Sequence, residues 1–153
     1  GNIPGSGASV TTVAALLFCQ SKALFVWAGD SRIYRMRGGE LELVTEDHNL
    51  AHERHRRGEL SLDEAQRLPS ANVLTKAIGI SKHLRLQTHI DEVEAGDRYL
   101  ISTDGLYKEF TFESLQQRLS GQFDHQILQT LIDEALKQGG KDNITGVVVD
   151  VGE

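Results

Sequence analysis

Three aspartates stand at the edges of apolar, strand-like runs and could bind a divalent cation. Asp30 ends ALFVWAG, Asp104 ends YLIST, and Asp142 comes just before ITGVVVDV. If these runs are neighbouring strands of packed sheets, the three carboxylates lie together at one end of the sheets, and their mutual repulsion calls for a cation. Carboxylate oxygens favour hard ions such as Mg²⁺ or Mn²⁺. Two such ions a few ångströms apart can activate a water molecule and hold a phosphoryl group.

The dipeptide Asp104-Gly105 also has a simpler interpretation. Asp-Gly is typical of tight turns, because Asp tolerates turn geometry and Gly adopts positive φ. In the metal interpretation, the strand end holds the carboxylate rigidly and the glycine gives close access to the backbone. Both interpretations stay open at this point, since each of the three aspartates taken singly could be a turn former.

A second polar stretch, HERHRRGE, contains Arg54, Arg56 and Arg57 together with two histidines. In a chain whose net charge is −6, this positive stretch could meet a phosphorylated or acidic partner. It could equally be the solvated face of a helix.

The histidines of this region suggest one further site. His48, His52 and His55 recur at i, i+4 and i+7, a spacing that can place imidazoles on one helical face as a zinc site. The interleaved arginines and the turn-like TEDHN around His48 argue against zinc.

Mixed strands and helices must position these residues. Two apolar runs joined by CQSK indicate a buried hairpin, and two alternating runs around Gly38-Gly39 indicate another with a primed-type turn. Helix starts are expected at Ser61, where Glu64 completes a capping box, at Thr111 and at Asp124. The strands are expected at 11–18, 23–28, 32–36, 40–44, 84–90, 98–103 and 144–151, and the helices at 62–68, 112–119 and 124–137. Without regular strand–helix alternation, the fold class is α+β with mostly antiparallel sheets.

The bulk composition predicts one domain over residues 1–153, with 39% hydrophobic and 25% charged residues. The acidic net charge argues against a nucleic-acid binder, and no apolar run approaches the roughly 18 residues of a membrane span. The single cysteine, Cys19, suits a reducing compartment, so a cytoplasmic protein is expected. Its place in an apolar run predicts a small buried side chain rather than a nucleophile.

Four motifs follow one another along the chain: VWAGDSRIYRMRGGELELVTEDH, NVLTKAIG, GDRYLISTDGLY and GGKDNITGVVV. In this order they resemble the PPM/PP2C family of metal-dependent protein serine/threonine phosphatases, its bacterial members above all, from about residue 11 to 151. The resemblance implies a β-sandwich of antiparallel sheets flanked by helices, with two to three Mn²⁺ or Mg²⁺ ions in a cleft of the complete domain. It also implies hydrolysis of phosphoserine and phosphothreonine on proteins through a metal-activated water.

The same resemblance suggests roles for individual residues. Asp104 of STDG and Asp142 of KDN match ligands of the dinuclear centre. Asp30 of GDSR matches the acid that holds a third ion in bacterial members. Gly105 then supplies backbone beside the metals and lets the chain turn there. No residue is assigned a catalytic role other than metal binding.

The resemblance also assigns the arginine-rich stretch. Residues from about 50 to 70 match the flap subdomain, a variable segment beside the cleft that influences substrate choice. Arg54, Arg56 and Arg57 thereby become candidate substrate contacts. The implied partners are phosphorylated proteins, with a cognate serine/threonine kinase and its substrates, and neither nucleic acid nor a membrane.

The chain departs from the family pattern at its start. Family members begin with a segment that carries two further aspartate ligands, one in an ADGMGG-like motif, and strands of both sheets. The chain is therefore expected to be the C-terminal two-thirds of the domain, without its N-terminal strands and helices, and to be weakly active. Exposed sheet edges are expected to pair it as a dimer. The alternative is a phosphatase-like binding or regulatory module without turnover, and a Ca²⁺-binding sandwich is a third class.

Overall fold

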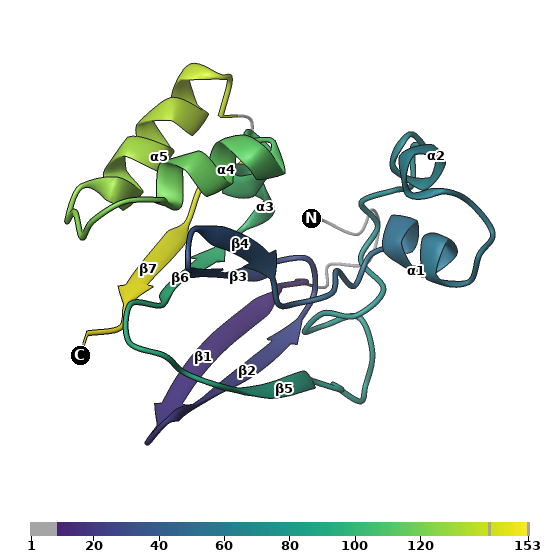
Figure 1. Ribbon diagram of the computed structural model, residues 1–153. Helices are drawn as coiled ribbons and strands as arrows, with labels where there is room; N and C mark the ends of the chain where they lie inside the picture. The colour runs from purple at the N-terminus through teal and green to yellow at the C-terminus, as the bar shows by residue number, and fades with distance from the viewer. Residues whose placement is uncertain (1–8, 141, 153) are drawn as a thin grey trace.

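The computed structural model describes residues 9–140 and 142–152 of the expected 1–153 domain. Strands and helices are mixed along the chain, with hairpins first and most of the helical residues later (Figure 1). The strands are β1 (Val13–Cys19), β2 (Lys22–Ala28), β3 (Arg32–Arg37), β4 (Glu40–Leu43), β5 (Gln87–Glu92), β6 (Arg98–Ser102) and β7 (Gly146–Asp150). The helices are α1 (Leu50–Arg56), α2 (Leu62–Gln66), α3 (Asp104–Tyr107), α4 (Phe112–Leu119) and α5 (Ile127–Lys137).

These strands form two antiparallel sheets, one in the order β1-β2-β5 and the other in the order β4-β3-β6-β7. Phe25 and Trp27 of the first sheet pack with Ile33 and Tyr99 of the second, so a buried aromatic and aliphatic layer joins the two. The prediction of an α+β fold with antiparallel sheets is confirmed.

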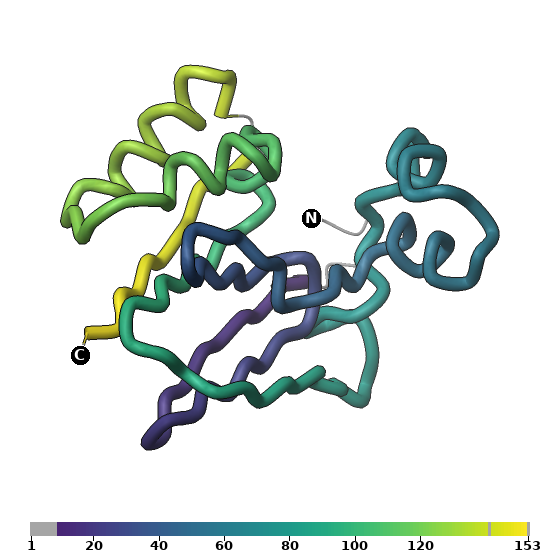
Figure 2. The backbone as a smooth tube through the Cα atoms, in the orientation of Figure 1, coloured from purple at the N-terminus to yellow at the C-terminus, as the bar shows by residue number. Residues whose placement is uncertain are grey.

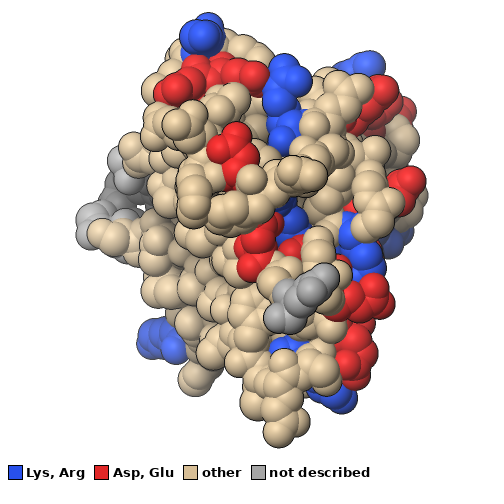
Figure 3. Space-filling model, turned by 60° about the vertical axis from the view of Figure 1, so that its left-hand side comes forward, with Lys and Arg blue, Asp and Glu red and all other residues tan. Residues whose placement is uncertain are grey.

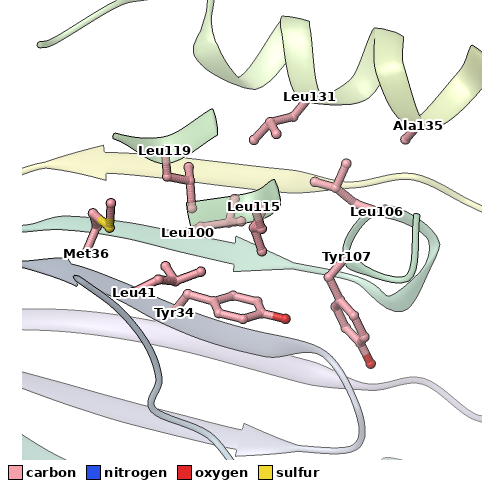
Figure 4. Close-up of a cluster of buried hydrophobic side chains, with 10 residues drawn as sticks. All are labelled: Tyr34, Met36, Leu41, Leu100, Leu106, Tyr107, Leu115, Leu119, Leu131 and Ala135. Atoms are coloured by element: carbon pink, nitrogen blue, oxygen red, sulfur yellow. The ribbon is translucent and has the colours of Figure 1, made fainter. Parts of the chain in front are cut away.

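Helices α4 and α5 cover the other face of the four-stranded sheet (Figures 1 and 4). Leu115 and Leu119 lie one helical turn apart on α4, and Leu131 and Ala135 are spaced likewise on α5, so each helix presents an apolar stripe to the sheet. Each fully buried leucine contributes about 2 kcal/mol by its removal from water. The cluster consists of Tyr34, Met36, Leu41, Leu100, Leu106, Tyr107, Leu115, Leu119, Leu131 and Ala135.

The outer face of the three-stranded sheet is apolar, yet the described chain leaves it open. Leu17 pairs with Leu24, which pairs with Ile90, and the exposed fractions of Leu17 and Ile90 are 53% and 61%. The expected hairpin is therefore present, but only its inner face is buried. The prediction of a buried Cys19 is wrong, because this last residue of β1 alternates onto the same outer face as Leu17. Figure 3, which views the molecule from another side, also shows a broad area without Lys, Arg, Asp or Glu side chains.

The local signals for turns and caps had mixed outcomes. Gly38 and Gly39 both have positive φ, 58° and 84°, which confirms the primed-type turn. Ser61 forms the expected capping box at α2, and Thr111 accepts a hydrogen bond at the start of α4. The expected cap at Asp124 is wrong, since its carboxylate accepts from the Gln126 backbone in a turn just before α5.

Helices α1 and α2 form a small lobe set apart from the two sheets (Figures 1 and 2). Ala51, Ala65 and Ala71 are buried together inside it, with Leu60 and Leu68 against them. This lobe covers the residues expected to form the flap, about 50–70, and is called the flap below. In the described residues, no helix has the length and apolar character needed to cross a membrane.

Candidate metal centre

Asp104 stands where strand β6 becomes helix α3. Thr103 is the N-cap of this helix, and its backbone N–H donates to the Thr145 carbonyl at 3.1 Å, while the Thr145 N–H donates to Thr103 Oγ1 at 3.1 Å. These bonds join the end of β6 to the loop that leads into β7. The carboxylate of Asp104 is therefore anchored close to the Asp142 loop.

Gly105 makes that closeness sterically feasible. A Cβ atom built at this position would overlap the backbone carbonyl oxygen of Asn143. Gly105 lies inside α3, and its φ is not positive. The expectation that Gly105 turns the backbone is therefore wrong: the glycine is needed for close packing of α3 against the Asp142–Asn143 loop.

Asp30 is held from the opposite side of the same region. It follows β2 directly after Gly29, whose φ is 115°, and only 6% of its surface is exposed. The Tyr107 hydroxyl donates to the Asp30 backbone carbonyl at 2.6 Å, so α3 fixes the Asp30 loop as well. Burial, and next the negative charge of Asp104, raise the pKa of Asp30 from 3.8 to about 6.

One pocket of about 560 Å³ collects the three predicted aspartates. Asp30, Asp104 and Asp142 all line it, although they come from segments far apart in the chain. Among the described residues, no group of three or more Asp, Glu, His or Cys side chains is close enough to hold a metal ion. The structure thus brings the predicted ligands to one pocket without closing them around a single point.

A part-buried polar network lies behind the Asp30 loop. Arg32 donates to both carboxylate oxygens of Asp47, at 2.9 and 2.7 Å, and to the Tyr34 hydroxyl at 3.0 Å. The Arg32 guanidinium also lies 4.0 Å from the centre of the Tyr107 ring. This cation–π contact orients the same tyrosine that holds Asp30, so the network fixes the Asp30 loop through Tyr107.

Lys108 forms the boundary between this pocket and a larger cavity under the flap. Its ammonium lies 3.5 Å from Asp104 and donates to the Asn72 side chain at 2.8 Å. Lys108 and Asn72 line both the carboxylate pocket and the flap cavity, which has a volume of about 730 Å³. The segment that follows the flap is thus linked to Asp104 through Lys108.

The predicted flap arginines do not line either pocket. Arg54 and Arg56 lie in α1, and Arg57 follows it and pairs with Glu53 and Glu59. The residues of the flap and its two flanks that line the larger cavity are Asn49, Ala51, His52, His55, Leu62, Gln66 and Asn72. Arg56 and Arg57 are exposed and Arg54 is half-buried, and none of the three lines the pocket of the carboxylates.

His48 belongs to the fold rather than to a histidine cluster. The Gly29 N–H donates to His48 Nδ1 at 3.0 Å, which leaves the proton on Nε2 to donate to Gln87 Oε1 at 2.8 Å. Burial lowers the pKa of His48 and keeps it neutral. Both ring nitrogens are thus occupied by hydrogen bonds that hold the strand β2 end beside Asp30.

Sequence reasoning missed Lys108, Asn72 and Tyr107. The signal for Lys108 was present, since a lysine four residues after Asp104 lies on the same helical face once α3 is recognised. Asn72 and Tyr107 gave no such signal, because their contacts join residues 36 and 77 positions apart.

The comparisons with known proteins agree on one family. The family model described as protein phosphatase 2C matches residues 7–139. The serine/threonine phosphatase stp of Listeria monocytogenes is 31% identical over 141 residues, which cover 92% of this chain and 56% of that protein. The chain thus spans just over half the length of this relative.

Solved structures give the same result. The S. agalactiae serine/threonine phosphatase superposes with a TM-score of 0.87 at 32% identity, covering 93% of this chain and 59% of that one. The catalytic domain of the serine/threonine phosphatase PstP, solved with two manganese ions, superposes with a TM-score of 0.83 at 32% identity, covering 94% of this chain and 60% of that one.

Proposed function

The chain belongs to the protein phosphatase 2C family, and we propose that it hydrolyses phosphoserine and phosphothreonine on proteins. The observation that carries this proposal is the single pocket lined by Asp30, Asp104 and Asp142. Among the described residues the other buried carboxylate, Asp97, is paired with Arg37, whereas the buried Asp30, the half-buried Asp104 and the exposed Asp142 share one pocket. The serine/threonine phosphatase activity named for such relatives is thus proposed for a chain that spans only part of their length.

The proposed cofactor is Mn²⁺ or Mg²⁺, with two to three ions in the complete domain. The donor set fits such ions, because it consists of carboxylates. Burial, and next the negative charge of Asp104, raise the pKa of Asp30, and a bound cation would favour its ionised form. In this proposal Asp104 and Asp142 hold the dinuclear centre and Asp30 holds a further ion. When bound, these ions supply an activated water and neutralise the phosphoryl group.

Other residues of the chain position these carboxylates. Tyr107 holds the Asp30 backbone, and Gly105 lets the Asp142 loop approach α3. We propose phosphorylated proteins as the substrates, including a cognate kinase and the substrates of that kinase. We propose the cytoplasm as the compartment. The surface arginines at 54, 56 and 57 would touch only a large substrate of this kind.

We further propose that the 153-residue chain alone is a weak enzyme that dimerises. The pocket offers three aspartates, and affinity for hard cations rises with the number and charge of the ligands. The open outer face around Leu17 and Ile90, together with the edge strands β1 and β7, gives a second copy an apolar surface to cover. Sedimentation would test the dimer, and a monomer at micromolar concentration would contradict it.

The function is tested by hydrolysis of an aryl phosphate and of a phosphothreonine peptide, with Mn²⁺ and with a chelator. The assay uses the 153-residue chain and the longest form that its gene encodes. We expect metal-dependent turnover of both substrates, weak in the shorter chain and lost in Asp142→Asn. A protein that binds the phosphopeptide in the presence of Mn²⁺ without hydrolysing either substrate would instead be a binding module.

A further inference from the structure

Lys108 lies where the flap meets the carboxylate pocket and is shared by the two cavities. Its ammonium contacts Asp104 Oδ2 at 3.5 Å and donates to Asn72 Oδ1 at 2.8 Å. An ammonium has three donor hydrogens, and 41% of this side chain is exposed. At least one hydrogen therefore remains for a group that enters either cavity.

Lys108 carries a positive charge in a pocket whose other charged lining residues are acids. The acids that line the pocket are Asp30, Asp104, Glu109 and Asp142. Within the described lining, Lys108 is the one cationic side chain. A phosphoryl dianion that approaches four carboxylates is repelled unless cations compensate, and Lys108 has the required sign at the required place.

We infer that Lys108 binds the phosphoryl group of the substrate, leaving Asp104 for a phosphoryl oxygen when Asp104 engages a divalent ion. Asn72 keeps the ammonium at the border of the two cavities during this exchange. No covalent bond forms or breaks in it, and Lys108 keeps its proton. The inference rests on the proposed phosphatase function and adds to it a substrate-binding residue.

Such a residue has two opposite effects on binding. Lys108 competes with a divalent cation for the Asp104 carboxylate, so its charge weakens metal binding. The same charge attracts a phosphate group, so it strengthens phosphate binding. A lysine that only held α3 to the flap would affect both affinities in the same direction.

The test is calorimetry on Lys108→Met, which keeps the length of the side chain and removes its charge. Mn²⁺ alone should bind about three- to fivefold more tightly than to the wild type, and inorganic phosphate in the presence of Mn²⁺ about tenfold more weakly. Lys108→Arg keeps the charge and should stay within about twofold of the wild type in both titrations. Lys22→Met is the matched control, because Lys22 makes a comparable ion pair with Glu92 at 3.7 Å, and it should change neither affinity.

Two results would overturn the inference. In Lys108→Met, weaker binding of both Mn²⁺ and phosphate would assign Lys108 a structural role, and an unchanged phosphate affinity would exclude it from substrate binding. Failure of the proposed function has a different signature. The wild-type protein would then bind neither Mn²⁺ nor phosphate, and the inference would fall with the function on which it rests.

Discussion

The aspartates on the sheets and those in the pocket are held in opposite ways. Three acids on or beside the strands each receive two hydrogen bonds from a single arginine: Asp47 from Arg32, Asp97 from Arg37 and Asp150 from Arg98. In the described part of the chain, no arginine pairs in this way with the acids of the pocket at positions 30, 104 and 142. Lys108 is the one basic side chain with an ion pair to them there.

One acid of each group, Asp97 on the sheets and Asp30 in the pocket, shows this difference in its pKa. Burial would raise the pKa of Asp97, but hydrogen bonds from Arg37 and from the Glu94 backbone outweigh it, so that the pKa lies below its usual range. Burial raises the pKa of Asp30 to about 6, and the charge of Asp104 adds to it. The acids of the sheets are thus compensated within the chain, and we propose that a cation from outside it compensates those of the pocket.

The largest expected effect breaks a compensated pair. Asp97→Ala leaves the Arg37 guanidinium, the Glu94 N–H and the Tyr99 hydroxyl without their acceptor, and should lower the free energy of unfolding by about 3 kcal/mol. Asp104→Ala should leave it within about 0.5 kcal/mol or raise it, because it relieves repulsion in the metal-free pocket. Urea unfolding measures both changes. Equal losses in the two variants would erase the distinction between the two groups.

The next effect disturbs the pocket without removing an acid. Gly105→Ala should destabilise the fold by about 2 kcal/mol and weaken Mn²⁺ binding, since the new methyl group pushes the Asn143 backbone away from α3. Gly152→Ala is the control, because a Cβ there meets no atom within 4 Å. Calorimetry and thermal unfolding check the pair. A Gly105→Ala protein as stable as Gly152→Ala would show that the close approach is not required.

A smaller effect concerns pH in the metal-free protein. The folded pKa of Asp30 is raised, so the folded state holds a proton that the unfolded state has released, and stability falls as pH rises from 3.8 to about 6. The loss should be on the order of 1 kcal/mol after allowance for solvent screening. Asp30→Asn should remove this slope. If urea unfolding at intervals across this pH range gave identical slopes for the two proteins, the pKa of Asp30 would not be raised in the folded state.

The smallest expected effect lies on the flap. Replacing Arg54, Arg56 and Arg57 together with Ala should lower kcat/KM for a phosphoprotein about two- to fivefold and leave an aryl phosphate unchanged, since surface charges reach only a large substrate. The control replaces the exposed Lys22, Lys82 and Lys137 with Ala. Equal losses on both substrates would mean that the arginines act on the metal pocket.

Much of the fold was predictable because its signals are local. The Gly38-Gly39 turn and the Ser61 capping box depend on residues next to one another, and both were confirmed. The strand ends at Asp30 and Asp104 were recognisable for the same reason. Burial was less predictable: Cys19 lies in an apolar run, but no local signal tells which face of β1 is covered.

The details of the site depend on distant contacts. Asp104-Gly105 was expected to turn, yet the structure uses the glycine against Asn143, 38 positions away in the sequence. The link from Lys108 to Asn72 likewise joins the end of α3 to the segment after the flap across 36 positions. One sequence shows which residues could bind a metal, but such pairings follow only from the packing of the whole chain.

The central proposal is that the aspartates of the pocket bind a divalent cation. Its most direct test is a Mn²⁺ titration that compares Asp104→Asn with Asp150→Asn. Both variants remove one negative charge, but Asp150 is already paired with Arg98. Under conditions in which both proteins are folded, Asp104→Asn should weaken Mn²⁺ binding at least about tenfold and Asp150→Asn less than about twofold. Wild-type affinity in Asp104→Asn would contradict the claim.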